Sequence, residues 1–372
     1  MNILVLRPGS RALNYALFTA GRRTPARSGR VADGGASPRE GPAVIERLAR
    51  VRAACSARPA ARRPEAIAVR VAFGGAQFKA PAPVTDAVID SLAELAPGAP
   101  LHLPALLLLL AGCRDVFPGV PTVLVFETAF FAELPLRERG YGMNPGLDPG
   151  LGLRRYGYHG IFHEAAARLA AREMYGRGGG AAPRTLSICL EPQPEIAAVI
   201  GRRPVMVTGG STPLEGLPGR TSCGELDPGI VLHLARKLRW GPEQINQCLT
   251  RESGLRGLTG RVVSLETVFR SDADGDEALR LAREIMRYRI LLASGAALAA
   301  MGAVDQIVFS GRGAKIGATL GPWLADRLAI PGRGAKPEIP WTTLRESLDR
   351  LIADAALPIA VRQEGAVKCP RA

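Results

Sequence analysis

The sequence lacks any cysteine pattern that would indicate a metal site or a local disulfide. Its six cysteines lie far apart, with no C-x-x-C pair and no spacing typical of zinc ligands. We therefore expect reduced thiols, as in a cytosolic protein.

The sequence also lacks a membrane-spanning run and a leader segment. The strongly apolar stretch from Leu106 to Leu110 is far too short to cross a bilayer and instead predicts a buried core helix. The chain begins directly with the strand-like Ile3 to Leu6, without a charged leader or a cleavage site. These absences predict a cytoplasmic protein without a membrane partner.

Acidic residues are too few to balance the basic ones, and the formal net charge is +14. The basic residues are nearly all arginine and are scattered along the chain rather than gathered in blocks. This distribution favours a compositional bias over a binding patch, so no nucleic-acid partner is expected. A basic nucleic-acid-binding protein has only the net charge in its support.

The length of 372 residues exceeds what a single core usually supports, so two domains are expected. Strand-like and helical stretches alternate, which is compatible with an α/β fold. We place the two domains at residues 1–128 and 129–372.

The most informative stretch, Val207 to Pro228, reads V-T-G-G-S-T-P-L-E-G-L-P-G-R-T-S-C-G-E-L-D-P. Its prolines and glycines predict a rigid turn, and Asp227 followed by Pro228 predicts a helix start. The stretch resembles the acetate kinases, in which a T-P-L-E-G turn leads through a glycine-containing loop to an Asp-x-Asp-Pro helix start.

Further blocks resemble the same family in the same order over nearly the whole chain. R-Y-G-Y-H-G at Arg155 to Gly160 is the second strong match, and Ile67 to Phe73 resembles a strand that ends in two glycines. Weaker matches are found at Leu101–Pro104, Glu127–Phe130, Ser253–Gly260 and Asp305–Gly311. The chain is thus identified as a divergent member of the acetate kinase family.

This resemblance implies a fold and an assembly. The fold would be the two-domain sugar-kinase, Hsp70 and actin type, which is ribonuclease H-like α/β with a central cleft. Each half would be an actin-like ATPase-type domain. The family is usually homodimeric, so a homodimer is expected.

The resemblance assigns Arg70 to carboxylate binding. The alternative is an arginine at a strand end that pairs with a structural acid. Other substrate-pocket positions fall on Ala72, Leu101, His102, Tyr158 and Pro213. Ala72 replaces a valine of the family, which would enlarge the pocket toward propionate.

The resemblance also assigns catalytic and metal-binding roles. His159 would donate to the phosphoryl group in flight, although a lone histidine is more often structural. Glu127 is expected to hold magnesium together with Glu364, but Glu127 is one methylene longer than the aspartate of the family. Arg220 is the candidate replacement for a catalytic arginine whose position here is Ser222.

ATP contacts would be expected at Gly9, Ser10, Ser310 and Gly311 by the same resemblance. Several neighbouring positions depart from the family: Arg7, Ala12, Asn14, Pro192 and Arg312. Two prolines within the segment Glu191 to Glu195 remove N–H donors, and its two acids bring negative charge toward a triphosphate.

Two functions are therefore expected. If the chain is active, it is a carboxylate kinase that converts ATP and acetate, or another short-chain carboxylate such as propionate, to ADP and an acyl phosphate. Its activity would be reduced, with Mg²⁺ and ATP both required. The alternative is a catalytically inactive homologue that binds a small carboxylate, an acyl phosphate or a protein.

Three local structures are also predicted. Residues 24–42 should form an exposed loop because they are rich in Arg, Gly, Ser and Pro. Thr343 and Glu346 have the spacing of a capping box. Leu357 to Lys368 loosely resembles the closing strand of the family.

Overall fold

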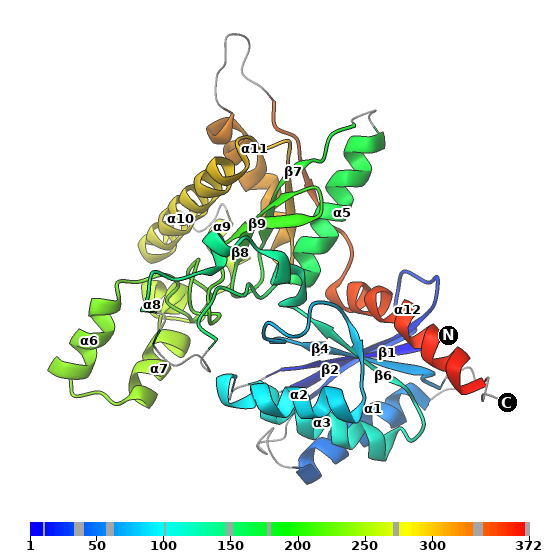
Figure 1. Cartoon of the computed structure of the whole chain (residues 1–372). Coiled ribbons are helices and arrows are strands. Elements are labelled where there is room, and N and C mark those ends of the chain that lie inside the picture. The colour runs from blue at the N-terminus through cyan, green and yellow to red at the C-terminus, as the bar shows by residue number, and fades with distance from the viewer. Residues whose placement is uncertain are drawn as a thin grey trace. The chain divides into compact units, whose positions relative to one another are not determined.

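The chain forms two compact units in the computed structural model (Figure 1). The structure describes residues 1–9, 12–32, 41–56, 63–99, 102–144, 146, 152–176, 180–270, 275–329 and 338–368, with side chains as far as residue 363. Unit 1 comprises residues 1–132, 148–152 and 346–372, and unit 2 comprises 133–147 and 153–345.

Unit 1 is built on a six-stranded mixed sheet in the order β3-β2-β1-β4-β6-β5. Strands β1, β4 and β6 run parallel, whereas β2, β3 and β5 are antiparallel to their neighbours. The strands are β1 (Asn2–Pro8), β2 (Ala12–Thr19), β3 (Arg27–Ala32), β4 (Ala66–Val71), β5 (Ala82–Pro83) and β6 (Thr122–Phe126). The central strands are buried along most of their length because they consist mainly of Val, Ile, Leu and Ala.

Helices cover both faces of this sheet (Figure 1). Helix α1 (Gly41–Ser56) packs on α3 (Leu103–Val116), which in turn packs on α2 (Asp86–Leu95). The 3₁₀ segments are η1 (Ala96–Gly98) and η2 (Ala129–Glu133). The apolar run from Leu106 to Leu110 lies in α3, which confirms the predicted core helix. None of the helices in the described part of the chain is long and apolar enough to cross a membrane.

The last helix, α12 (Leu348–Lys368), belongs to unit 1 although it follows unit 2 in the chain. It packs on β1, β4 and β6 through the buried residues Ile352, Ala356 and Ala360. The expected division at 128/129 therefore lies close to the first change of unit, but it assigns residues 346–372 to the wrong unit. The helix also corrects the strand expected over Leu357 to Lys368.

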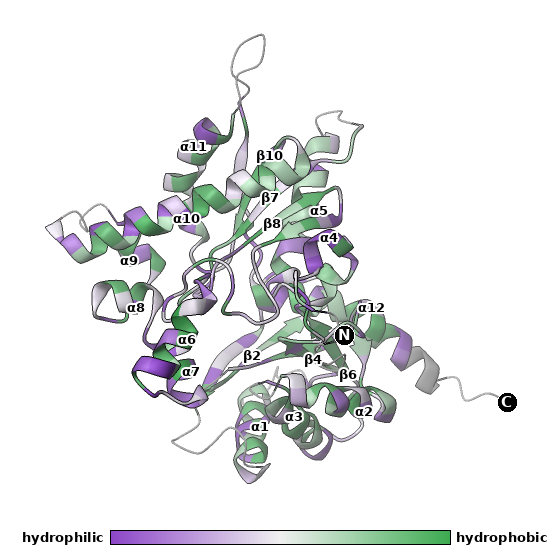
Figure 2. Cartoon of the chain, turned by 60° about the vertical axis from the view of Figure 1, so that its left-hand side comes forward, coloured by the Kyte–Doolittle hydropathy of each residue, from purple (hydrophilic) through white to green (hydrophobic). Residues whose placement is uncertain are grey.

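Unit 2 contains a five-stranded sheet in the order β11-β10-β7-β8-β9. Strands β7, β10 and β11 are parallel, and β8 and β9 add antiparallel pairs. The strands are β7 (Arg184–Cys189), β8 (Glu195–Ile200), β9 (Arg203–Val207), β10 (Gln306–Ser310) and β11 (Trp341–Thr343). Figure 2 shows β7 and β8 largely in hydrophobic colours, in agreement with their burial.

Helices also pack on the sheet of unit 2. Helix α5 (Gly160–Gly176) contacts β7 and β10, and α10 (Glu277–Met301) contacts β8 and β9. The remaining helical segments are α4 (Leu136–Arg139), α6 (Pro228–Lys237), α7 (Pro242–Arg251), α8 (Gly254–Thr259), α9 (Leu265–Phe269), η5 (Ala314–Ile316) and α11 (Gly317–Leu328).

Helix starts show where local sequence rules hold. The Asp227 side chain accepts a hydrogen bond from the Gly229 N–H at 2.8 Å and caps α6, as predicted. The predicted capping box at Thr343 and Glu346 is wrong. Thr343 ends β11, and Ser347 caps α12 by accepting from the Arg350 N–H at 3.2 Å.

The predicted exposed loop at residues 24–42 is only partly correct. Residues Arg27–Ala32 form the edge strand β3, which pairs with β2. Most of its residues are exposed, because an edge strand with one covered side tolerates polar residues. Residues 33–40 of the predicted loop lie outside the described part.

Candidate functional site

The structure brings two predicted site residues of unit 1 into direct contact. Arg70 lies near the end of β4, and Glu127 directly follows the neighbouring parallel strand β6. The Arg70 Nε donates to Glu127 Oε1 at 2.5 Å. The Glu127 side chain is fully buried, whereas that of Arg70 is 23% exposed. Arg70 thus pairs with an acid, as the structural alternative required, but that acid is itself a predicted catalytic residue.

His102 lies near this pair, at the start of α3. Desolvation by neighbouring groups, followed by the positive charge of Arg70, lowers the pKa of His102 below its usual value, although part of the residue is exposed. The imidazole is therefore neutral at pH 7. Ala72, the predicted pocket residue after β4, is half-buried, and Leu101 lies outside the described residues.

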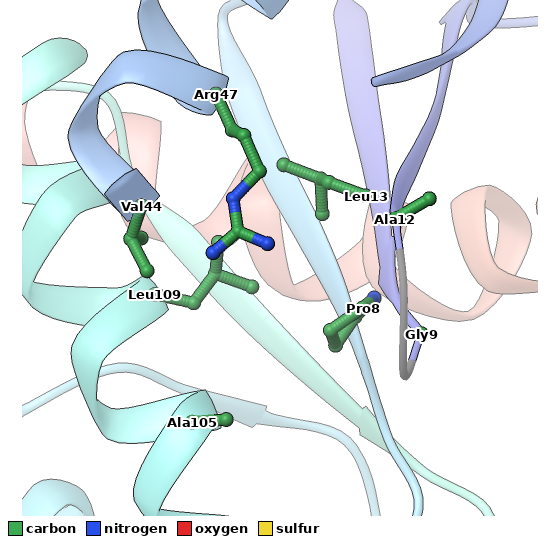
Figure 3. A pocket seen from close by; sticks show the side chains of 8 residues that line it. All are labelled: Pro8, Gly9, Ala12, Leu13, Val44, Arg47, Ala105 and Leu109. Carbon is green, nitrogen blue, oxygen red and sulfur yellow. The ribbon is translucent and has the colours of Figure 1, made fainter. Parts of the chain in front are cut away.

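A small pocket of about 40 Å³ lies at the end of β1 (Figure 3). Gly9, a predicted nucleotide-binding residue, lines this pocket, and the guanidinium of Arg47 points into it from α1. The other lining residues are Pro8, Ala12, Leu13, Val44, Ala105 and Leu109. Ser10 lies outside the described residues. The nearby Arg7 does not line the pocket; it pairs with Asp349 of α12, with Nη2 and Oδ2 3.1 Å apart.

In unit 2, the two blocks with the strongest resemblance lie against each other. The Tyr156 N–H donates to the Gly210 carbonyl at 3.0 Å, and the Tyr158 hydroxyl donates to the Ser211 carbonyl at 2.5 Å. Arg155 forms an ion pair with Glu215 at 2.6 Å. These bonds fasten the R-Y-G-Y-H-G segment to the T-P-L-E-G turn. Pro213, at the tip of that turn, is exposed.

His159 is fixed at both its backbone and its ring. Its Nε2 lies 2.9 Å from the Gln193 carbonyl oxygen. Because a carbonyl only accepts hydrogen bonds, Nε2 carries a proton. Its backbone N–H donates to Glu195 Oε1 at 2.9 Å. The imidazole is therefore held in one orientation with an N–H donor.

Glu195 connects several parts of this region from the start of β8. Its carboxylate also accepts from the Tyr158 N–H at 3.0 Å and lies 3.3 Å from the His163 Nε2. Burial by itself raises the pKa of Glu195, but hydrogen bonding from His163 and the charges of the two imidazoles lower it overall. The residue is therefore ionised at pH 7. Sequence reasoning missed this role, although an acid at the head of an apolar strand was a usable signal.

His163 is a buried structural residue of α5. Its Nδ1 lies 2.8 Å from the Ser187 Oγ, and its Nε2 faces Glu195. Within the described ranges no group of three or more His, Cys, Asp or Glu is arranged to hold a metal ion.

The segment Glu191 to Glu195 has the weakest resemblance to the family. It forms an ion pair and hydrogen bonds with other residues that differ from those of the family. Glu191 pairs with Arg312 at 2.9 Å. The Ser222 hydroxyl donates to the Gln193 side chain, whose Nε2 donates to the Leu217 carbonyl at 3.1 Å. Both acids expected to face a triphosphate are thus paired within the chain.

Arg220, the candidate replacement cation, is held through its backbone. Its N–H donates to the Pro192 carbonyl at 2.6 Å, while its side chain is exposed. The structure therefore places Arg220 beside the segment Glu191 to Glu195, with its charge at the surface.

The residues at the expected magnesium site do not provide the ligands that Mg²⁺ requires. The Glu127 carboxylate is buried and bonded to Arg70, which is not the water-accessible oxygen site that magnesium requires. The Glu364 side chain lies outside the described residues.

Nucleotide phosphates do not fit the loop after β10 as it stands. Gly311 has a positive φ of 84°, and the buried Ser310 Oγ has no hydrogen-bond partner among the described residues. These two features suit a ligand. However, the N–H of Arg312 already donates to Glu191 Oε1 at 2.9 Å, so a carboxylate of the chain takes this donor.

Two α/β units, each a mixed sheet flanked by helices, define the sugar-kinase, Hsp70 and actin class of fold. The structure is similar to the acetate kinase of Porphyromonas gingivalis, with a TM-score of 0.80 and 26% identity over 96% of this chain and 99% of that chain. It is also similar in fold to a propionate kinase from Francisella tularensis, with a TM-score of 0.79 and 22% identity over 95% and 98% of the two chains.

Sequence comparisons define the family. Residues 41–318 match the Acetokinase family. The acetate kinase of Streptomyces griseus is 34% identical over 333 residues, which cover 83% of this chain and 79% of that protein. The acetate kinase of Clavibacter michiganensis subsp. michiganensis is 40% identical over 251 residues, 66% of this chain and 62% of that protein. The chain thus spans less than two thirds of this relative. The chain belongs to the acetokinase family.

Proposed function

We propose that the chain is an acetate-kinase-type phosphotransferase that forms an acyl phosphate from a short-chain carboxylate, with ATP as phosphoryl donor and with reduced activity. The observation that carries the proposal is the fixed orientation of His159 within the best-preserved blocks of unit 2. The acetate kinase names of the relatives support the same reaction.

The residues of unit 1 supply the carboxylate site in this proposal. Arg70 would bind the substrate carboxylate by charge-assisted hydrogen bonds while Glu127 holds the guanidinium in place. The neutral His102 and the small Ala72 would line the alkyl side. Ala72 is smaller than the valine of the family, so the pocket would accept propionate as well as acetate.

Residues of unit 2 would act on the phosphoryl group. His159 supplies an N–H donor, which the Gln193 carbonyl takes in this structure. Ser222 stands where the family has its catalytic arginine, and removal of such a cation costs on the order of a thousandfold in rate. The rate is therefore reduced unless the exposed Arg220 enters the site.

The alternative is an inactive homologue that binds a carboxylate or an acyl phosphate. The pairing of Glu191 with Arg312, and of Gln193 with Ser222, favours it. Through these bonds, the groups that would otherwise contact a nucleotide already have partners within the chain. A cytoplasmic location is part of both proposals.

A homodimer is also part of both proposals. Helix α10 exposes Leu281, Tyr288 and Leu292 at helical spacing, which suits burial by a second copy. Sedimentation equilibrium should give twice the chain mass, and a monomer at micromolar concentration would refute the dimer.

A hydroxamate assay for acyl phosphate tests the proposed reaction. Product should form from ATP with acetate and with propionate, and it should be lost in Arg70→Ala and His159→Ala. Calorimetric titration with propionate and acetyl phosphate distinguishes the alternative. Binding of either compound without any product would select the inactive homologue and refute the kinase.

A further inference from the structure

One ion pair joins the loops that follow β7 and β10. Glu191 Oε2 accepts from the Arg312 Nη2 at 2.9 Å and from its Nε at 3.0 Å, and Oε1 accepts from the Arg312 N–H at 2.9 Å. The Glu191 side chain is 12% exposed, whereas that of Arg312 is 71% exposed. A mostly buried carboxylate thus takes three donors from one surface residue.

This pair lies where α/β sheets commonly bind ligands. Strands β7 and β10 are parallel neighbours, with Cys189 opposite Ser310, so both loops leave the carboxyl edge of the sheet. Backbone N–H groups in glycine-rich turns at this edge bind anions. The buried Ser310 Oγ, which has no hydrogen-bond partner within the described part of the chain, lies at the same edge. The anion found at this turn is the Glu191 carboxylate.

The two loops are also closed onto each other through the backbone. The Gly313 N–H donates to the Leu190 carbonyl at 2.8 Å. A Cβ at Gly311 would lie 3.0 Å from the Leu190 carbonyl carbon. Little room remains between the loops for a phosphate group.

The charge at Glu191 opposes a polyphosphate. Burial raises its pKa, but hydrogen bonding and charge from Arg312, together with the charge of His159, lower the pKa overall. The group is ionised at pH 7 and lies close enough to His159 for the two to interact. An ionised carboxylate at this position repels phosphate oxygens.

We infer that Glu191 and Arg312 form a latch that closes the anion position at this edge of unit 2, so that a nucleotide binds tightly only after the latch opens. The inference rests on the proposed function because it concerns the site of the phosphoryl donor. It makes these two residues determinants of donor affinity.

Calorimetric titration with ATP and, separately, with inorganic tripolyphosphate tests the latch. Glu191→Gln removes the negative charge and releases the arginine, so both ligands should bind about tenfold more tightly or better than to the wild type. The double variant Glu191→Gly/Arg312→Gly should also gain affinity. Arg312→Ala should not, because the carboxylate remains.

A second ion pair on the same strands provides a matched control. Arg184 begins β7 and pairs with Asp305, just before β10, with an Nη2–Oδ1 distance of 2.6 Å. Asp305→Asn therefore breaks a comparable pair at the opposite edge of the sheet. It should leave both affinities unchanged.

The latch is refuted if Glu191→Gln and the double variant, folded by circular dichroism, bind no more tightly than the wild type. An equal gain in Asp305→Asn, or a gain for ATP without one for tripolyphosphate, also refutes it. The hydroxamate assay is read separately. Tighter binding without any acyl phosphate upholds the latch and refutes the kinase, whereas product without tighter binding refutes the latch alone.

Discussion

At the scale of single residues, Arg70 has both a structural and a functional interpretation. Its guanidinium compensates the charge of Glu127, a fully buried carboxylate. The same guanidinium falls on the carboxylate-binding position of the family. A variant that only removes Arg70 confounds the two roles, because it also breaks the ion pair of a buried carboxylate.

A double variant separates these roles. Arg70→Ala should lower the free energy of unfolding by about 3–5 kcal/mol, since the buried Glu127 carboxylate loses its ion pair with Arg70. Arg70→Ala/Glu127→Gln should recover most of this loss but should not bind propionate. Urea unfolding and calorimetric titration measure the two effects.

An exposed pair of the same unit serves as the control. Arg114 pairs with Asp86 at 2.9 Å, and both side chains are largely exposed. Arg114→Ala should cost less than about 1 kcal/mol. If the double variant at Arg70 and Glu127 binds propionate as the wild type does, Arg70 has only a structural role.

Residue identity indicated candidate site residues, but not the partners that these residues have in the structure. Motif order proposed Arg70 and His159 as site residues, and the acids at 191 and 195 were expected to face a triphosphate. Glu191 instead pairs with Arg312, 121 residues away along the chain, and Glu195 is buried against α5. Such pairing depends on the tertiary structure, which local sequence does not encode.

At the scale of secondary structure, the start of α12 distinguishes two possible caps. Thr343 and Glu346 have the capping-box spacing, but Thr343 lies opposite Phe309 of β10, and the next N–H, from Leu344, donates to the Phe309 carbonyl at 2.8 Å. The strand pairing therefore prevails over the local signal. Ser347 caps the helix in its place.

Two alanine substitutions test this assignment. Ser347→Ala should lower the free energy of unfolding of unit 1 by about 1 kcal/mol, because the Arg350 N–H loses its acceptor. Thr343→Ala should have a smaller effect. Urea unfolding of both variants provides the comparison, and a larger loss for Thr343→Ala would contradict the observed cap.

At the scale of the whole molecule, the family resemblance predicted the α/β fold, but not the membership of each unit. Long buried strands and the cap at Asp227 followed from local sequence rules. The return of α12 to unit 1 did not, because it depends on contacts between the two ends of the chain. Composition alone gives no information on such contacts.

Ionised carboxylates in unit 2 make the stability of the protein sensitive to acid. The pKa of Glu195 is lowered overall, and hydrogen bonding from Arg184 lowers the pKa of Asp305. Unfolded carboxyl groups titrate near pH 4, above these folded values. The contribution of both groups is therefore fully present above the unfolded pKa and is lost as the pH falls through the folded pKa.

The melting temperature should thus be constant near neutral pH and should fall steadily below about pH 5. Glu195→Gln should melt lower at pH 7, since its amide NH₂ would face the N–H donors of Tyr158 and His159. The same variant should lose less stability on acidification, because it has no proton to take up at this position. Glu164→Gln, at a partly exposed position of α5, should follow the wild type at every pH. A Glu195→Gln variant with an unchanged dependence on pH would show that Glu195 is not the ionised group on which this acid sensitivity depends.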